Sequence, residues 1–312
     1  MSMKPSPTSA RGPVQKAWGR GTAGALMNSW FGSDFVQGKR PMNKTLFFGL
    51  CVLVLASCTK QDGPPAQSDG PKIQEGKPYP TVNEADVKGI ARTRFDSPNP
   101  TVAQLARRTK NNKTIREMGL PVLESLPVVE DEQTVKLRGP EEIAKRCLAT
   151  TFCAAKGETK DQKLVDSLIK EYSAEGYLSL EEQRFIKAMA PPQQALIDFS
   201  WRYECVHVFL WATGARDTLS PPNEICPVSD DMKLIRKAGP AKFVPGAKRR
   251  TAQEILDMAD YYYRLHWAAI ELRIKDKDSK LLDEGVIRER HRALNWLIGY
   301  LNQEWDDVTT DT

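Results

Sequence analysis

Apolar residues recur at helical spacing along most of the chain from residue 140 onward. The run Ile287, His291, Leu294 shows the three- to four-residue return that is typical of an amphipathic helix. Ser179 with Glu182, and Thr251 with Glu254, have the spacing of capping boxes. The pattern predicts helices over residues 102–118, 140–155, 161–174, 179–190, 193–213, 230–238, 251–274 and 283–302. Strand-like alternation is confined to residues 134–137.

These elements predict a mainly α fold, with a single multi-helix globular domain after a signal peptide and a flexible linker. Four segments are expected. Residues 1–41 are an over-long start or a disordered arm, and 42–57 a signal peptide. Residues 58–90 are a tether rich in Gly, Pro, Gln and Asp, because such a composition cannot bury a core. Residues 91–312 form the helical domain.

The predicted signal peptide ends within a short motif that indicates covalent lipid attachment. Residues 46–56 form an apolar run of eleven, which is too short for a transmembrane helix of about 20 residues but fits a signal-peptide core. The run ends in Leu55-Ala56-Ser57-Cys58, which resembles the lipobox of bacterial lipoproteins. That resemblance implies that the Cys58 thiolate takes a diacylglyceryl group and that the new amino terminus is acylated, for example by palmitate. The competing interpretation is a buried apolar segment.

The same resemblance implies a location in the cell envelope. The chain would be attached to a membrane through lipid on Cys58, and more than one acyl chain makes such attachment stable. Thr59 stands where an Asp would favour inner-membrane retention, so the expectation is the outer membrane, facing the periplasm.

Charge argues against nucleic acid as a partner. The formal net charge is +5, from 45 Lys and Arg against 40 Asp and Glu. Residues 1–57 hold seven of the basic and one of the acidic residues, so positions from 58 onward hold 38 basic and 39 acidic ones, a net of −1. A processed chain is therefore nearly neutral and lacks the excess charge of a nucleic-acid binder.

Several segments together resemble a known bacterial family. Two of them, Glu289–Trp296 (ERHRALNW) and residues 305–312 (WDDVTTDT), are the most specific. They follow RGPEEIAKRCLA (138–149), LSLEEQRFI (178–186), WRYECVHVFLWATG (201–214) and EILDMADYYYRLHWA (254–268) in chain order. The chain resembles the domain-of-unknown-function 4272 family over roughly residues 90–312. The resemblance implies an α-helical domain and carries no established activity or catalytic residue.

Three histidines are the main candidates for chemistry, and each lies in a predicted helix. His207 follows Glu204 in a Glu-x-x-His spacing that places both groups on one helix face, while His266 and His291 lie on apolar stripes. A pocket formed by Glu204, His207, His266 and His291 is one interpretation. The other is that they are core residues with buried hydrogen-bond partners. Because the second Glu-x-x-His of a di-iron site is missing, no metal and no cofactor is predicted.

Two other sets of side chains leave alternatives open. The tryptophans, Trp296 among them, either pack in the core or form an aromatic cage. Arg288, Glu289, Arg290 and Arg292 form either an anion clamp or a solvated face with ion pairs.

Four cysteines remain once the leader and Cys58 are set aside. They are Cys147, Cys153, Cys205 and Cys226. Cys147 and Cys153 are about 9 Å apart along one helix, too far to pair with each other. Either of them could form a disulfide with Cys205 or Cys226 in an oxidising compartment; the alternative is buried free thiols.

The function expected from these observations is a protein-interaction module of the cell envelope with an unknown protein partner. No Gly-x-Ser-x-Gly, Walker or dinucleotide-binding motif occurs in the sequence, which argues against those enzymes. The alternative is an envelope enzyme or a ligand- or metal-binding domain that uses a pocket in the helical core.

Overall fold

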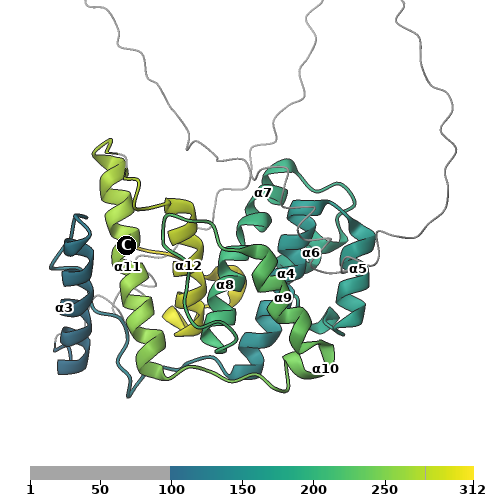
Figure 1. Ribbon diagram of the computed structural model, residues 1–312, viewed down its shortest axis with the longest axis horizontal. Helices are drawn as coiled ribbons and strands as arrows, with labels where there is room; N and C mark the ends of the chain where they lie inside the picture. The colour runs from purple at the N-terminus through teal and green to yellow at the C-terminus, as the bar shows by residue number, and fades with distance from the viewer. Residues whose placement is uncertain (1–98, 278) are drawn as a thin grey trace, which may run out of the picture.

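The computed structural model describes residues 99–277 and 279–312 (Figure 1). The predicted arm, signal peptide and tether, and Cys58 with them, lie outside the described residues. The described residues form one helical domain without a strand, which confirms the predicted mainly α fold. The sequence predicts strand-like structure at residues 134–137. They are irregular instead, and the N–H of their neighbour Arg138 donates to Leu297 O at the end of a helix.

The helices follow the predicted order. They are α3 (Val102–Glu117), α4 (Pro140–Thr159), α5 (Gln162–Glu171), α6 (Leu180–Lys187), α7 (Gln193–Trp201), α8 (Tyr203–Ala212), α9 (Val228–Ala238), α10 (Pro240–Phe243), α11 (Ala252–Ile274) and α12 (Glu284–Leu297), with 3-10 turns η2 (Glu175–Tyr177), η3 (Tyr300–Asn302) and η4 (Trp305–Asp307).

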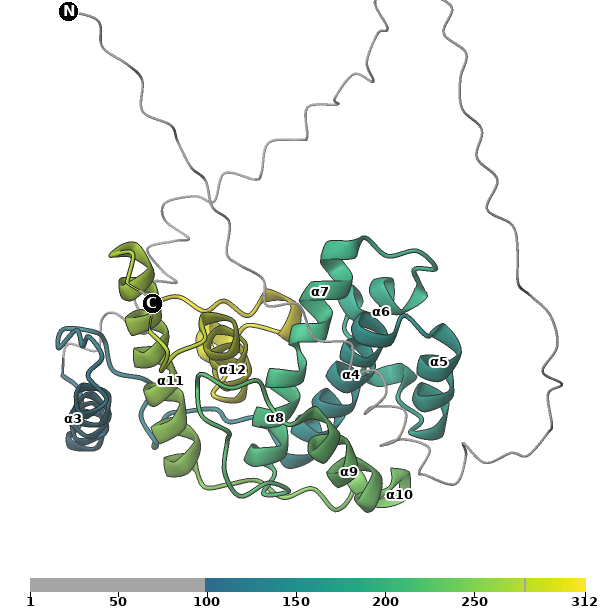
Figure 2. The ribbon, with the colours of Figure 1, turned by 45° about the horizontal axis from the view of Figure 1, so that its top comes forward.

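The helices pack in one order across the molecule. α3 packs on α11, α11 on α12, α12 on α8 and α8 on α4, while α5, α6 and α7 also contact α4 (Figures 1 and 2). Every residue of α8 is buried, as is most of α4. The core therefore lies around α4, α8 and α12.

Helix α4 is longer than the sequence predicts. The pattern places its end before Gly157, but the helix continues to Thr159. A Cβ at Gly157 would lie 2.6 Å from Leu196 O and 2.7 Å from Ser200 N of α7. The glycine therefore allows α4 and α7 to cross at close backbone contact, and it is needed for packing rather than for ending the helix.

Two other predicted boundaries are corrected. The single helix predicted over 193–213 is divided at Arg202, whose N–H donates to Phe199 O, three residues back, in a tight turn. The last helix is predicted to reach residue 302, but α12 ends at Leu297 because Gly299 adopts a left-handed conformation with φ of 64°.

Both predicted capping boxes are confirmed. Ser179 Oγ accepts a hydrogen bond from Glu182 N, and Glu182 Oε2 accepts one from Ser179 N. Thr251 and Glu254 make the same reciprocal pair at the start of α11. Within residues 99–277 and 279–312, no helix combines the length and apolar character that a bilayer span requires.

Candidate functional site

A buried ion pair connects α8 to α12. Arg290 Nε lies 2.8 Å from Glu204 Oε2, and neither side chain is exposed to solvent. Glu204 Oε1 also accepts a hydrogen bond from Cys226 N at 2.7 Å. Burial raises the pKa of the Glu204 carboxyl, whereas Arg290 and the Cys226 N–H oppose that rise. Each oxygen of the carboxylate therefore has a hydrogen-bond partner.

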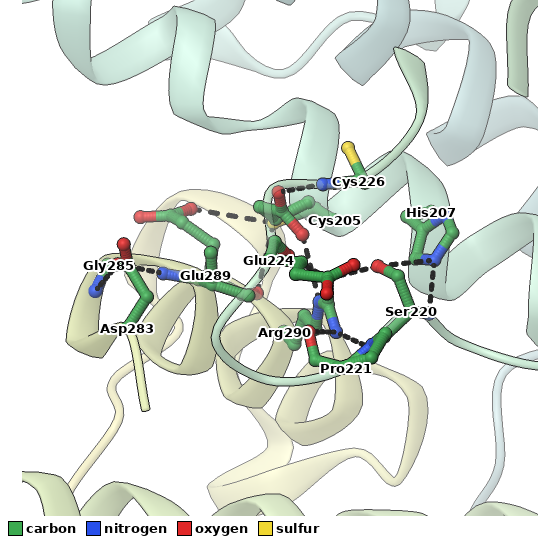
Figure 3. A network of polar contacts seen from close by, with 12 residues as sticks. Cys205, His207, Ser220, Pro221, Glu224, Cys226, Asp283, Gly285, Glu289 and Arg290 are labelled. Atoms are coloured by element: carbon green, nitrogen blue, oxygen red, sulfur yellow. Dashed lines mark hydrogen bonds and ion pairs between the residues drawn. The ribbon is translucent and has the colours of Figure 1, made fainter. Parts of the chain in front are cut away.

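Arg290 also fastens the loop between α8 and α9 (Figure 3). Its Nη1 donates to Ser220 O at 2.5 Å and to Tyr262 Oη at 2.8 Å. Its Nη2 donates to Ser220 Oγ at 2.7 Å and to Glu224 O at 3.1 Å. With its donors used in this way, Arg290 holds the loop and has no capacity left for a ligand.

His207 belongs to the same network (Figure 3). Ser220 N donates to His207 Nε2 at 3.0 Å, so Nε2 is the unprotonated nitrogen. Nδ1 therefore carries the hydrogen and donates to Asp231 Oδ2 at 2.7 Å. Asp231 Oδ1 in turn accepts from Arg216 at 2.7 Å. Like Glu204, His207 is a core residue with buried partners.

Ser220, His207 and Asp231 have the order of groups found in a serine-hydrolase triad. Ser220 Oγ lies 3.4 Å from His207 Nε2. However, the lone pair of Nε2 already accepts the Ser220 N–H, and Ser220 Oγ accepts a hydrogen bond from Arg290. A general base must have that lone pair available for the hydroxyl proton. The arrangement is therefore a structural network and lacks an activated nucleophile.

The other two histidines form a separate pair between α11 and α12. His266 Nδ1 and His291 Nδ1 are 3.0 Å apart, so one ring donates to the other. Burial, and then the positive charges of Arg288 and Arg273, lower the pKa of His266 to about 4. His266 is thus held neutral at pH 7.

The predicted four-residue pocket is divided into these two buried clusters. Glu204 of α8 pairs with Arg290 of α12 and His207 bonds Ser220 and Asp231, whereas His266 and His291 meet between α11 and α12. None of the four lines the two pockets described below, of 340 and 930 Å³, and no group of three or more metal-ligating side chains occurs in the described part of the chain.

The four predicted cysteines are buried free thiols. Burial is the largest cause of the raised pKa of each thiol. A thiol that does not ionise is a poor nucleophile, so these side chains behave as apolar core residues. Of the two interpretations that the sequence allows, a disulfide or buried free thiols, the structure shows free thiols. The four residues are Cys147, Cys153, Cys205 and Cys226.

The arginine-rich run on α12 is divided, since Arg288, Glu289 and Arg292 line one pocket and Arg290 does not. Arg290 is buried in the network described above, and Arg292 donates to Trp305 O and Val308 O. Glu289 pairs with Arg202 at 2.6 Å and with Arg288 at 3.5 Å, at the edge of a 340 Å³ pocket. That pocket has balanced charge, with three arginines and three carboxylates in its wall: Arg202, Arg288, Arg292, Glu181, Asp198 and Glu289.

A larger pocket opens at the start of α4. Its volume is about 930 Å³, near the upper end of the range of about 300–1,000 Å³ that small-molecule sites occupy. It is lined by Gly139 just before α4, residues 140–142 and 145–146 of α4, residues 176–180 from η2 to α6, Trp296 of α12 and residues 304–307 around η4. It therefore joins segments from four distant parts of the chain.

Glu182 is buried next to this pocket and bonds two of its lining residues, Arg146 and Trp305. It is 1% exposed, and its Oε1 accepts from Trp305 Nε1 at 3.0 Å. Its Oε2 lies 2.8 Å from Arg146 Nη2, which also donates to Tyr177 O at 2.5 Å. This carboxylate links α4, α6 and η4, so the pocket has a fixed wall.

The two tryptophans of the pocket do not form an open cage. The Trp305 ring has guanidinium carbons of Arg146 at 5.2 Å and of Arg292 at 5.1 Å from its centroid. The Trp296 ring has Arg138 at 5.0 Å and meets Trp305 edge-on at 6.0 Å. Because these cation–π positions are occupied from within the domain, the rings contribute a rigid apolar floor.

Two polar atoms of the pocket residues remain without a hydrogen-bond partner among the described residues. They are the Nε1 donor of Trp296, which is 3% exposed, and the Oδ1 acceptor of Asp306. Both atoms are themselves buried, so neither offers an accessible hydrogen-bonding group to the open space of the pocket. Leu180, at the start of α6, adds a 68% exposed apolar side chain to the same pocket.

The chain belongs to the family described as Domain of unknown function (DUF4272), which matches residues 107–308. The match confirms the resemblance read from the motifs, and it includes all the segments that line the larger pocket. No curated protein and no solved structure matches the chain.

The sequence does not identify the residues of the pocket as a site. Trp305 and Asp306 enter only as part of the WDDVTTDT motif, and Tyr177 and Leu180 lie in a turn and at a helix start. The available signal is the position of two tryptophans and two adjacent acids near an otherwise irregular end of the chain.

Proposed function

We propose that the chain is a bacterial lipoprotein, attached to the envelope through lipid on Cys58, whose helical domain binds a protein partner through the 930 Å³ pocket. The anchor rests on the Leu55–Cys58 motif and the apolar run before it. The binding role rests on one observation. The pocket combines a rigid apolar floor with an exposed Leu180.

This site supports binding better than catalysis. A catalytic site needs an acid, base or nucleophile whose proton or lone pair is available beside open space. Glu204 and Arg290 bond each other and the loop between α8 and α9, and His207 bonds that loop and Asp231 of α9. In the wall of the larger pocket Glu142, Lys145 and Arg146 are paired around an apolar floor, the arrangement in which an interface anchors a partner side chain.

The anchor is tested by metabolic labelling with palmitate. The full chain is expected to incorporate label and fractionate with outer membranes. Cys58→Ala is expected to lose the label and to accumulate with its leader uncleaved. Persistent labelling of Cys58→Ala would overturn the anchor.

The binding role is tested by crosslinking in native membranes and affinity purification of the tagged, lipidated protein. We expect one stoichiometric protein partner, and we expect Leu180→Gln to reduce its recovery at least about fivefold, as loss of an interface anchor does. Ile274→Gln is the matched control, because Ile274 is 70% exposed at the end of α11 and outside the pocket. Equal recovery from the two variants would exclude the pocket as the binding surface.

A further inference from the structure

We infer that the pocket takes a basic side chain on a short peptide segment of the partner, an inference that rests on the proposed function and names the chemistry of its ligand. Five carboxylates line the pocket against two basic side chains, a net of −3. The carboxylates are those of Glu141, Glu142, Glu304, Asp306 and Asp307, and the basic groups those of Lys145 and Arg146.

The positive side chains at the pocket already lie beside carboxylates of the same domain. Arg146 pairs with Glu182 at 2.8 Å, in a contact where both side chains are at most 6% exposed. Lys145 lies 3.7 Å from Glu141. Arg138, just outside the lining, pairs with Glu142 at 2.9 Å and contacts Glu304 at 3.6 Å. Among the described residues of the wall, an anionic ligand would therefore have only the partly exposed Lys145 to pair with, and it would face five carboxylates.

Only some of the carboxylates at the pocket have an ion-pair partner. Neither Asp306 nor Asp307 has an ion-pair partner within the described part of the chain. Asp306 Oδ2 accepts one hydrogen bond, from Glu181 N at 3.0 Å, and its Oδ1 is buried without one. The Asp307 carboxylate is exposed and therefore favours a ligand that brings a positively charged donor, since charge-assisted hydrogen bonds are the stronger kind.

The shape of the pocket favours an organic cation over a metal ion. The described residues include no group of three or more side chains placed to hold a metal. The volume of about 930 Å³ and the apolar side chains of Tyr177, Leu178 and Leu180 suit a chain of several atoms. A lysine or arginine has this form, with an apolar stem and a charged end, and neighbouring apolar residues of the partner would cover Leu180.

The inference is tested by calorimetric titration of the full lipidated protein, in neutral detergent, with a short capped peptide that contains two lysines and one leucine. The matched peptide carries acetyl-lysine at both positions, which removes the charge and keeps the stem. We expect the lysine peptide to bind at least about tenfold more tightly, and its affinity to fall as salt is raised.

Charge-neutral variants assign that binding to the pocket. Asp306→Asn with Asp307→Asn is expected to lower affinity for the lysine peptide at least about tenfold. Glu117→Gln with Asp230→Asn removes the same charge from exposed positions elsewhere and should leave affinity unchanged. Because Asp306 also supports the start of α6, Asp307→Asn alone is measured as well, with at least about a threefold loss expected.

Equal binding of the two peptides, no binding of either, or undiminished binding to the Asp307→Asn variant would overturn the inference. The outcome is separable from that of the proposed function. If Leu180→Gln still loses the native partner while the lysine peptide fails to bind, the pocket remains the docking surface and the basic ligand is wrong.

Discussion

Arg290 and Glu204 form an ion pair in which both side chains are fully buried, 86 residues apart in the chain. Through this pair α12 holds both α8 and the loop that leads to α9 (Figure 3). Taking two charges out of water costs free energy, so the pair must be complete for the core to tolerate it.

Glu204→Gln is therefore expected to destabilise the domain strongly. The substitution leaves the Arg290 charge buried without its counter-ion, and removing one partner of such a pair costs about 3–5 kcal/mol. Urea unfolding followed by circular dichroism measures the free energy of unfolding. The control is Glu284→Gln, whose partner Arg273 is 60% exposed; breaking an exposed pair costs about 0–1 kcal/mol. Similar losses in the two variants would contradict the structural role of Glu204.

The His266–His291 pair predicts a loss of stability in acid. The pKa of His266 is lowered to about 4 in the folded domain, below the ordinary 6.5 of an unfolded histidine. The unfolded chain therefore binds more protons between these two values, so stability is complete above pH 6.5 and declines as pH falls towards 4. The expected loss is about 3 kcal/mol, because a tenfold difference in proton affinity between the folded and unfolded states corresponds to about 1.4 kcal/mol.

The measurement is the free energy of unfolding at several pH values for the parent chain and for His266→Gln. The difference between the two curves isolates the histidine from the carboxylates that also titrate in this range. A parallel pair of curves would show that His266 does not cause the decline.

Gly157→Ala is expected to destabilise the crossing of α4 and α7. The added Cβ would lie within 2.7 Å of two backbone atoms of α7, which cannot move independently of their helix. Overpacking of this kind costs typically about 1–3 kcal/mol, although alanine is the better helix former. Gly176→Ala, where a Cβ meets open space, is the matched control for thermal unfolding. A stabilised Gly157→Ala would show that the helices separate freely.

The four buried thiols are expected to resist alkylation in the folded domain. Burial raises the pKa of each, so little thiolate exists at about pH 8. Mass spectrometry after iodoacetamide treatment should find none of them labelled in the native chain and all of them labelled in urea without reductant. Incomplete labelling in urea would reveal a disulfide in the purified protein. The sites are Cys147, Cys153, Cys205 and Cys226.

The helices can be predicted from the sequence because their apolar spacing and capping boxes are local signals. The predictions fail where tertiary contact overrides local preference. The sequence places a helix end at Gly157, but a close approach of α7 requires this glycine. Arg202 divides a continuous apolar run, and its side chain pairs with Glu289 on α12. Neither contact can be predicted from the spacing of nearby residues in the sequence.

The candidate site is harder to predict for the same reason. The partners of His207 and Glu204 include Ser220 N and Cys226 N, backbone groups of a loop whose path the sequence does not specify. The larger pocket depends on Trp305 and Asp306 in an irregular segment without periodicity. Helical spacing can place the histidines in the core, but only the fold shows which core side chains are satisfied.

The most direct test of the binding surface is a photo-crosslinking amino acid placed at position 180 of the lipidated protein in living cells. Leu180 is 68% exposed at the pocket, so its replacement should leave the fold unchanged. We expect an adduct of one defined mass from position 180 and none from position 274, on the exposed end of α11. No adduct from position 180, or the same adducts from both positions, would contradict the assignment of this pocket as the site where the partner binds.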